Sequence, residues 1–387
     1  MILEEETFKK LRLNSPPGGW FPALQDLSLY ITESNLPYAN LFLSPNLKRI
    51  SIYVSWPWNN TAHPLGALQT LASITSTLPT SSLERISVGT NHQAMPWAHL
   101  RDSFSSIILR CGPSFTECDS PIPLSNAALD HLIHLPHFHT WRIHGPPPAY
   151  PTSSLPLVFP PLRELTLGKG AACGWLPLLR RLEGGSSTTQ GVTPLSKAKE
   201  FLKVLNVRDV SGINIGASFV STIQCFRNLV HLNAGVHCEY SRGECIFKLN
   251  NDNVTELAMA LTQLESLLLG RPCSKNTCLT TVACLLQISV HCRKLEELDI
   301  HFNTTNIVND FKNILEDPRF QQLLSLPKCR LMSLHVYLTP LSLDESDFEI
   351  VGNGMVDIFP SLMDLDALGG DWLGPSMKIM DLQEGWE

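Results

Sequence analysis

The sequence predicts an α/β solenoid, in which short parallel strands line one side and helices cover the other. Three observations predict it. An apolar triplet of the form Leu-x-x-Leu-x-Leu, with other apolar residues tolerated, recurs about twelve times along the chain. Helical periodicity appears between several of the copies. Hydrophobic residues make up 43% of the 387 residues and charged residues only 17%, which indicates a continuous apolar interior with a thin charged shell.

The repeat from 278 to 302 shows the pattern most completely. Leu295, Leu298 and Ile300 alternate as they would on one face of a strand. The run before them has apolar residues at roughly helical spacing, namely Leu279, Val282, Leu285, Leu286 and Ile288. One strand and one helix cannot close a core, so this unit needs similar units on either side. The template is that of a leucine-rich repeat, with an inner parallel sheet and outer helices arranged as a horseshoe.

The remaining copies follow in chain order. Their triplets are Leu24, Leu27 and Leu29; Leu47, Ile50 and Ile52; Leu83, Ile86 and Val88; a degenerate copy at 115–120; Phe138, Trp141 and Ile143; Leu162, Leu165 and Leu167; Leu202, Leu205 and Val207; Leu229, Leu232 and Ala234; Leu264, Leu267 and Leu269; Leu331, Leu334 and Val336; and Leu362, Leu365 and Ala367. The mean step is about 31 residues, longer than the common 20–29. Because the steps are uneven, we expect irregular repeats with variable outer elements.

The segments between triplets complete the predicted organisation. Helices are expected at 67–77 and at 124–135, and the Gly- and Ser-rich stretch 184–191 is expected to be a mobile loop. Residues 1–20 form a lead-in and residues 21–368 the solenoid. Residues 369–387, where the pattern stops, form a cap or a disordered tail.

Charge and cysteine content limit the possible functions and compartments. The net charge of -7 offers no global basic field for nucleic acid or anionic lipid, and no apolar run is long enough to span a membrane. The N-terminus is acidic where a signal peptide is basic, and the 11 cysteines contain no C-x-x-C pair. We therefore expect a cytoplasmic or nuclear protein that is not secreted, with reduced thiols and with neither nucleic acid nor membrane as a partner.

No stretch of the sequence predicts catalysis or a cofactor. The glycines of 168–174 do not keep the spacing of a dinucleotide loop, so a repeat turn is the preferred interpretation. Five histidines lie between His131 and His144, but Pro136 interrupts them and no Cys or carboxylate completes a metal-ligand spacing. We expect no metal, no cofactor, no catalytic residue and no enzymatic activity.

The concave strand face is the predicted functional surface, since side chains between the inward leucines point there. Arginine and tyrosine are common at binding hot spots, and the acidic pairs Glu297/Asp299 and Asp364/Asp366 mark the last copies. The predicted partner-binding residues are Arg49, Tyr53, Arg85, Arg142, His144, Asn206, Arg208, Glu297, Asp299 and Tyr337. The alternative for each is an ordinary solvated strand position. Reversing the charge at Arg142 and Arg208 is expected to weaken binding without changing thermal unfolding.

Several segments resemble the leucine-rich-repeat region of fungal F-box proteins, those of basidiomycetes in particular. They are Phe21–Leu29, Leu43–Ile50, Cys111–Phe115, Phe159–Leu165 and Phe359–Leu362. The resemblance implies a substrate receptor of a cullin-RING ubiquitin ligase. The F-box itself is absent, because residues 1–20 are too short to contain one. Skp adaptor and cullin are therefore expected partners only if an F-box lies outside this chain. The alternative is a leucine-rich-repeat scaffold unrelated to ubiquitination, such as a cytoplasmic sensor or a regulator of a small GTPase.

Overall fold

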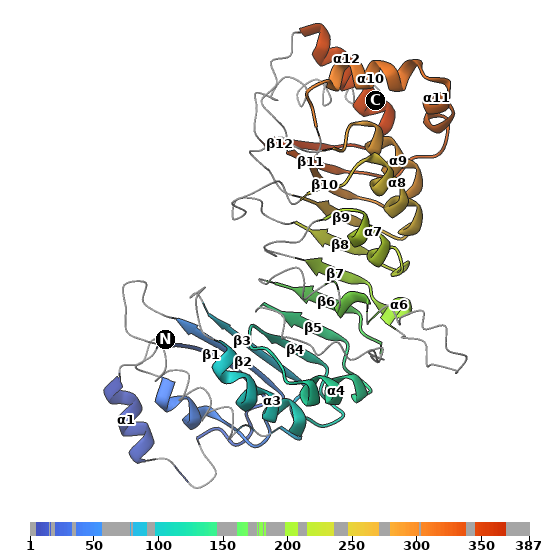
Figure 1. Ribbon diagram of the computed structural model, residues 1–387. Coiled ribbons are helices and arrows are strands. Elements are labelled where there is room, and N and C mark those ends of the chain that lie inside the picture. The colour runs from blue at the N-terminus through green and yellow to red at the C-terminus, as the bar shows by residue number, and fades with distance from the viewer. Residues whose placement is uncertain are drawn as a thin grey trace, which may run out of the picture. The chain divides into compact units, whose positions relative to one another are not determined.

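The computed structural model describes residues 5–14, 16, 20–32, 36–55, 78, 80–90, 97–144, 161–168, 176, 178–180, 182, 198–207, 215–235, 247–270, 279–301, 303–337 and 345–368. The chain forms two compact units. Unit 1 comprises Met1–Gly168 with Gln190–Ala198, and unit 2 comprises Lys169–Thr189 with Lys199–Glu387. Figure 1 labels the elements of both units.

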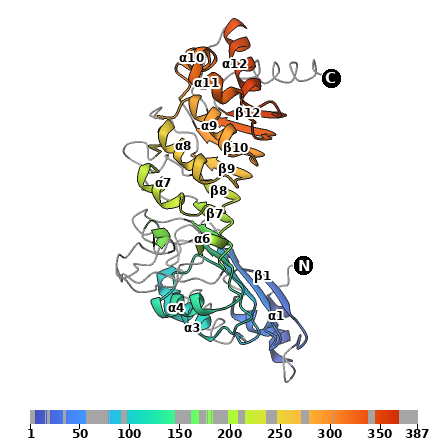
Figure 2. The ribbon, with the colours of Figure 1, turned by 90° about the vertical axis from the view of Figure 1, so that its right-hand side faces the viewer.

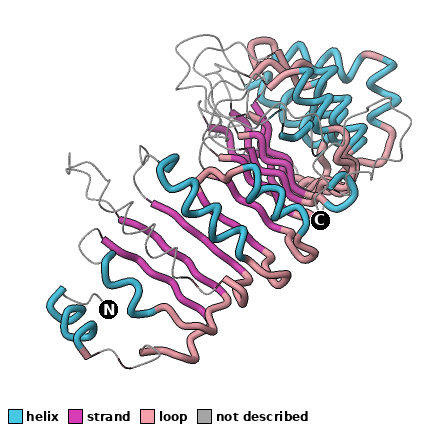
Figure 3. The backbone as a smooth tube through the Cα atoms, turned by 60° about the horizontal axis from the view of Figure 1, so that its bottom comes forward, coloured by secondary structure: helices cyan, strands magenta, loops and turns pink. Residues whose placement is uncertain are grey.

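Unit 1 contains a parallel sheet in which each strand pairs with the next one in the chain. Its strands are β1 (Asp26–Thr32), β2 (Arg49–Ser55), β3 (Arg85–Thr90), β4 (Glu117–Ser120), β5 (Thr140–Ile143) and β6 (Glu164–Leu167). Its described helices are α1 (Glu5–Leu13), η1 (Leu36–Phe42), η2 (Trp97–Leu100), α3 (Arg101–Arg110) and α4 (Asn126–His134). Figure 3 shows the strands as parallel magenta runs beside the cyan helices.

Unit 2 repeats the arrangement, again with every strand parallel to its neighbour in the chain. Its strands are β7 (Val204–Val207), β8 (His231–Ala234), β9 (Ser266–Leu269), β10 (Glu297–His301), β11 (Ser333–Tyr337) and β12 (Asp364–Leu368). Its helices include α7 (Ala217–Ile223), α8 (Asn251–Ala260), α9 (Ala283–His291), α10 (Ile307–Glu316), α11 (Pro318–Leu324) and α12 (Glu345–Ile358), and α6 (Ala198–Phe201) lies at the boundary. In Figure 2, α7, α8 and α9 lie on one side of strands β8 to β10.

The predicted α/β leucine-rich-repeat fold is confirmed. Each of the twelve predicted triplets ends in a strand, and each strand pairs in parallel within its unit. Alternating burial explains why. In β2, Ile50, Ile52 and Val54 are each 1% exposed, whereas Arg49 is exposed on the opposite face. In the inner copies the apolar triplets therefore form the core against the helices, and the intervening positions form the opposite strand face. Leu24, Leu27 and Leu29 of the first copy are half-buried.

A repeated hydrogen-bond pattern holds neighbouring strands in register. The carbonyl oxygen of Gln25 accepts from the backbone N–H groups of Lys48 (2.8 Å) and Arg49 (2.9 Å). Corresponding pairs of N–H groups donate to the carbonyls of Lys48, Glu84, Thr116, His139, Lys203, Val230, Glu265, Glu296 and Met332. Because the same contact begins most strand pairs, equivalent triplet positions lie side by side. The register places polar side chains of successive repeats in rows across the strand face.

The helices agree with the sequence in part. In α4, Ala128, Leu129 and Leu132 are buried as predicted, and the Ser125 hydroxyl caps the helix by accepting from the Ala128 N–H (3.2 Å). The helix before β10 is shorter than the run of helical spacing that includes Leu279. The helix α9 begins at Ala283, and Leu279 instead forms an isolated bridge with Asn250 and is 59% exposed. The helical spacing of Leu279 was therefore coincidental.

The predicted lead-in contains a helix that covers the first repeat. The ring of Phe8 in α1 stacks on Tyr38 with centroids 5.6 Å apart and meets Phe42 edge-on at 6.1 Å. The indole N–H of Trp20 donates to the Leu11 carbonyl (3.1 Å). The two ring contacts attach α1 to η1, and the hydrogen bond holds Trp20 against the end of α1.

The predicted helix at 67–77, loop at 184–191 and tail at 369–387 lie outside the described residues. Among the helices that the structure describes, none combines the length and the apolar character needed to cross a bilayer.

Candidate functional site

The strand face of unit 1, meaning the face formed by the side chains between the buried triplet positions of β1 to β6, is the first candidate surface. Pairing of neighbouring strands places its side chains in three rows. The first row contains Asp26, Arg49, Arg85, Glu117, Thr140 and Glu164. The second contains Ser28, Ser51, Ser87, Asp119, Arg142 and Thr166. The third begins with Tyr30, Tyr53 and Gly89.

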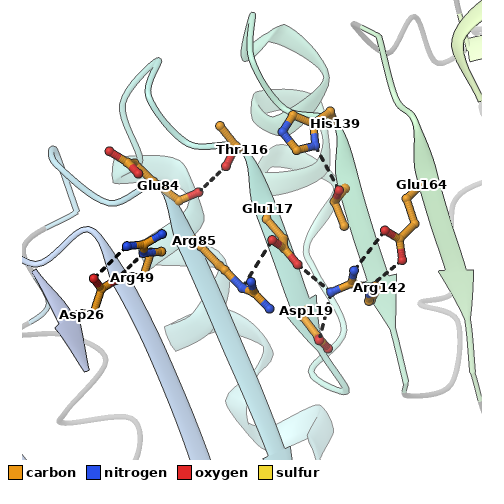
Figure 4. A network of polar contacts seen from close by, with 11 residues as sticks. Asp26, Arg49, Glu84, Arg85, Thr116, Glu117, Asp119, His139, Arg142 and Glu164 are labelled. Carbon is orange, nitrogen blue, oxygen red and sulfur yellow. Dashed lines mark hydrogen bonds and ion pairs between the residues drawn. The ribbon is translucent and has the colours of Figure 1, made fainter. Parts of the chain in front are cut away.

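Opposite charges in the first two rows form ion pairs between strands (Figure 4). At one end the Arg49 guanidinium holds Asp26 with two hydrogen bonds, from Nε to Oδ1 and from Nη2 to Oδ2, the second at 2.7 Å. Both side chains are more than half exposed. This pair is therefore a solvated contact between β1 and β2.

A larger network crosses β3 to β6. Arg142 donates from Nη1 to Glu117 (2.6 Å), from Nε to Glu164 Oε1 (2.7 Å) and from Nη2 to Glu164 Oε2 (3.0 Å). Glu117 also pairs with Arg85 at 3.3 Å. Asp119 lies 3.7 Å from Arg142 and 3.0 Å from the His144 Nε2. We call these six residues the β3–β6 ion-pair network.

The β3–β6 ion-pair network is partly screened from water. Glu117 is only 13% exposed and Arg142 28%. The hydrogen bonds to Glu164 raise the pKa of Arg142, aided by the charges of Glu117 and Asp119, although partial burial opposes this. In the exposed pair, the hydrogen bond from Arg49 lowers the pKa of Asp26. Both shifts favour the charged forms of Arg142 and Asp26.

The predicted arginines thus lie on the predicted face but are occupied. Arg49, Arg85 and Arg142 each bind a carboxylate of an adjacent strand. Two cations of the β3–β6 ion-pair network face three carboxylates, so the network is nearly neutral. It stabilises the register of the strands and does not present a basic surface.

Two tyrosines form an aromatic step beside the charged rows. The rings of Tyr30 and Tyr53 stack with centroids 5.0 Å apart and planes 13° apart. Tyr30 is 70% exposed and Tyr53 37%. Gly89 on the next strand leaves room for the Tyr53 ring, since a Cβ there would lie 3.1 Å from Tyr53 Cδ2. The predicted residue Tyr53 is therefore half of a preformed, solvent-facing platform.

The strand face of unit 2, built in the same way from β7 to β12, has a different chemistry. Its strands carry no lysine or arginine among the described residues, but they carry the predicted Glu297 and Asp299. These two line a shallow pocket of about 200 Å³. The other lining residues are Ser266, Leu267, Leu268, Leu298, Ser333 and His335.

The remaining predicted residues are placed as follows. Asn206 is half-buried on β7, in register with Asn233 of β8. The backbone of Tyr337 ends β11, and Arg208 lies outside the described residues. The predicted set of partner-binding residues leaves out the neighbours that complete each site, although alternation assigns all of them except Gly89 to the strand face. They are Asp26, Tyr30, Gly89, Glu117, Asp119, Glu164, Ser266, Leu268, Ser333 and His335. The sequence does contain an indication of these neighbours, namely opposite charges or two aromatic residues at equivalent positions of successive copies.

One group resembles catalytic machinery but lacks its geometry. The Ser333 hydroxyl lies 3.1 Å from the His335 Nε2 and 3.5 Å from Asp364 Oδ2. In a hydrolytic triad the carboxylate orients the histidine, whereas here it contacts the serine. In the part of the chain that the structure describes, no three His, Cys, Asp or Glu side chains converge as metal ligands. Burial raises the pKa of Cys111 and Cys292 to about 12, which makes these thiols poor nucleophiles.

Comparison with known proteins adds little beyond the fold. No protein-family model matches the chain, and no curated protein matches it. Among solved structures, an internalin (InlF) from Listeria monocytogenes is similar, with 12% sequence identity. The match covers 98% of this chain and 87% of the internalin chain, with a TM-score of 0.39. At this level of similarity, nothing follows about partners or activity.

Proposed function

We propose that this protein is a non-catalytic scaffold that binds a protein partner on the strand face of unit 1. The stacked Tyr30–Tyr53 platform is the observation that carries the proposal. Large aromatic side chains that are already ordered bury much area at low entropic cost, and they are enriched at binding hot spots. A free tyrosine pair on a strand face contributes little to the fold, because the core lies on the other side of the sheet.

The surroundings of the platform favour a protein partner over nucleic acid. The adjacent arginines are neutralised by carboxylates, and the net charge of the chain is -7. Binding to a phosphate backbone requires cations that are not already paired. The described arginines of these strands are each paired with a carboxylate. Ser28, Ser51 and Ser87 form a row of small hydroxyl side chains between the charged row and the tyrosines. An extended segment of a partner can hydrogen-bond to this row while its apolar side chains contact the rings.

The proposal is tested by placing a photo-crosslinking amino acid, p-benzoylphenylalanine, at Tyr30 in cells that express the protein. The matched control carries the crosslinker at Leu109, which is 44% exposed on the helix α3. A defined protein adduct formed from position 30 but not from position 109 supports the proposal. Adducts from position 109 alone would place the partner on the helices and refute it.

The partner obtained in this way allows a quantitative check. Tyr30→Ala and Tyr53→Ala should each weaken its binding about tenfold, as expected for an aromatic anchor. The melting temperature should stay nearly constant for Tyr30→Ala, whose side chain is mostly in solvent. Unchanged affinity in both variants would exclude the platform as the site.

A narrower form of the proposal is that the partner is a substrate presented for ubiquitination. It is supported by the resemblance of segments such as Phe21–Leu29 and Phe359–Leu362 to fungal F-box receptors, and its alternative is a repeat scaffold outside that pathway. Co-purification of a Skp adaptor and a cullin with the full-length gene product from its native cells tests this form. Recovery of the crosslinked partner without either protein would favour the alternative.

A further inference from the structure

The shallow pocket on the strand face of unit 2 is separate from the tyrosine platform and has no role in the function proposed so far. It spans β9, β10 and β11. Ser266, Glu297 and Ser333 lie in one row, and Leu268, Asp299 and His335 lie in the next. Its volume of about 200 Å³ can hold one long side chain but not a folded element or a nucleotide.

The charge of this pocket contrasts with that of the other strand face. In unit 1, each described carboxylate of the first two rows pairs with an arginine from a neighbouring strand. Around the pocket, Glu297 has no cationic partner among the described residues, and Asp364 on β12 receives only the Ser333 hydroxyl at 3.5 Å. The pocket is therefore complementary to a cation that the described strands of unit 2 do not provide.

The shape and the lining specify what kind of cation fits. Leu268 is half-buried and offers an apolar wall for an aliphatic stem. The Glu297 carboxylate can accept hydrogen bonds from a charged head group, and Asp299, two residues further along the same strand, adds a second negative charge to the lining. Ser266 and Ser333 add hydroxyl oxygens on either side. A flexible stem that ends in a cation matches this combination, which is the chemistry of arginine and lysine.

We infer that this pocket binds a basic side chain, arginine or lysine, of the protein partner. The inference rests on the proposed scaffold function and names the chemistry of a second contact. The apolar stem packs on Leu268. The head group neutralises the acidic lining of this pocket, as arginines of the chain itself do on the strand face of unit 1. A metal ion is disfavoured, because the described residues include no converging set of three ligands.

The test uses the full chain with 13C-methyl-labelled leucine, because Leu267, Leu268 and Leu298 all line the pocket. The probes are acetyl-Gly-Arg-Gly-amide and the corresponding lysine peptide, with citrulline in place of arginine as the neutral isostere. We expect saturable shifts of the methyl groups of these three leucines with a basic peptide, and an affinity at least tenfold lower for the citrulline peptide. Glu297→Gln should weaken binding of the basic peptide about tenfold, as loss of a charged hydrogen bond does.

The matched control is Glu296→Gln, which removes the same charge from an exposed neighbour outside the pocket lining. It should leave the affinity unchanged. Absence of shifts at Leu268 with both basic peptides, equal binding of citrulline, or equal effects of the two glutamine variants would each overturn the inference. The peptides bind without the partner, so this outcome is independent of crosslinking at Tyr30. Failure of the crosslinking alone would refute the platform and leave the pocket as a site for basic ligands.

Discussion

Replacing Arg142 by methionine separates a structural role of the β3–β6 ion-pair network from a binding role. Methionine keeps an apolar stem but removes the hydrogen bonds to Glu117 and Glu164. Truncating one partner of a fully buried pair costs about 3–5 kcal/mol, and an exposed pair contributes only about 0–1. Arg142 is 28% exposed and its partners 13–23%, so we expect a loss of about 2 kcal/mol. In a unit of this size that lowers the melting temperature by about 4–8 °C, measurable by circular dichroism.

Arg49→Met is the matched control, because Arg49 has the same side chain, face and unit but its pair with Asp26 is more than half exposed. It should change the melting temperature little. In a double-mutant cycle, Glu164→Gln should cost less in the Arg142→Met background than alone, since the carboxylate then lacks its cation. Equal effects of the two arginine variants, or unchanged melting with Arg142→Met, would refute the structural role. The sequence-based expectation of altered binding without altered stability would then stand.

Three further predictions concern other parts of the fold. Gly354→Ala should lower stability, because the added Cβ would overlap the buried Phe311 ring. Overpacking of this kind costs about 1–3 kcal/mol, whereas the higher helix propensity of alanine contributes about 1 kcal/mol. The urea midpoint measures the net change. Phe8→Ala should release α1 from η1, seen as faster amide exchange in residues 5–13, with unchanged exchange in β10 as the reference. Burial lowers the pKa of His301 and His291 below 6.5, so the unfolded chain binds protons at a higher pH than the folded chain does. The free energy of unfolding should therefore fall as the pH drops below about 6.5, and His301→Asn should make it depend less steeply on pH. Equal urea midpoints at pH 7.5 and pH 5.5 would contradict this.

The strand spine could be predicted because it depends on a local pattern. Leu295, Leu298 and Ile300 are buried for the same reason as their counterparts in other copies, and a period of two in apolar residues is visible without knowing the neighbours. Helix starts are less local. Leu279 keeps helical spacing with α9, yet the chain bridges to Asn250 before the helix begins. The bridge to Asn250 determines where the helix can begin, and the spacing of apolar residues within one segment does not reveal such a long-range contact.

The site could be predicted only as a face. Alternation alone assigns Arg142 to the strand face, but it does not show that Glu117 and Glu164 lie within hydrogen-bond distance on either side. That fact depends on the register between repeats separated by irregular connections. The aromatic platform illustrates the same limit, because Tyr53 alone is an exposed side chain and becomes a platform only through Tyr30 and the space left by Gly89.

The two strand faces divide the requirements of binding in different ways. A guanidinium that is already paired with a carboxylate must give up that pair to bind a partner, so Arg49, Arg85 and Arg142 add little net affinity. The Tyr30–Tyr53 platform is uncharged, so binding there breaks no ion pair. Glu297 has no described cation to lose, so a basic side chain gains its full attraction minus desolvation. Internal pairing thus indicates which charged residues stabilise the sheet, and Glu297, which has no cationic partner among the described residues, is the proposed contact for a basic side chain of the partner.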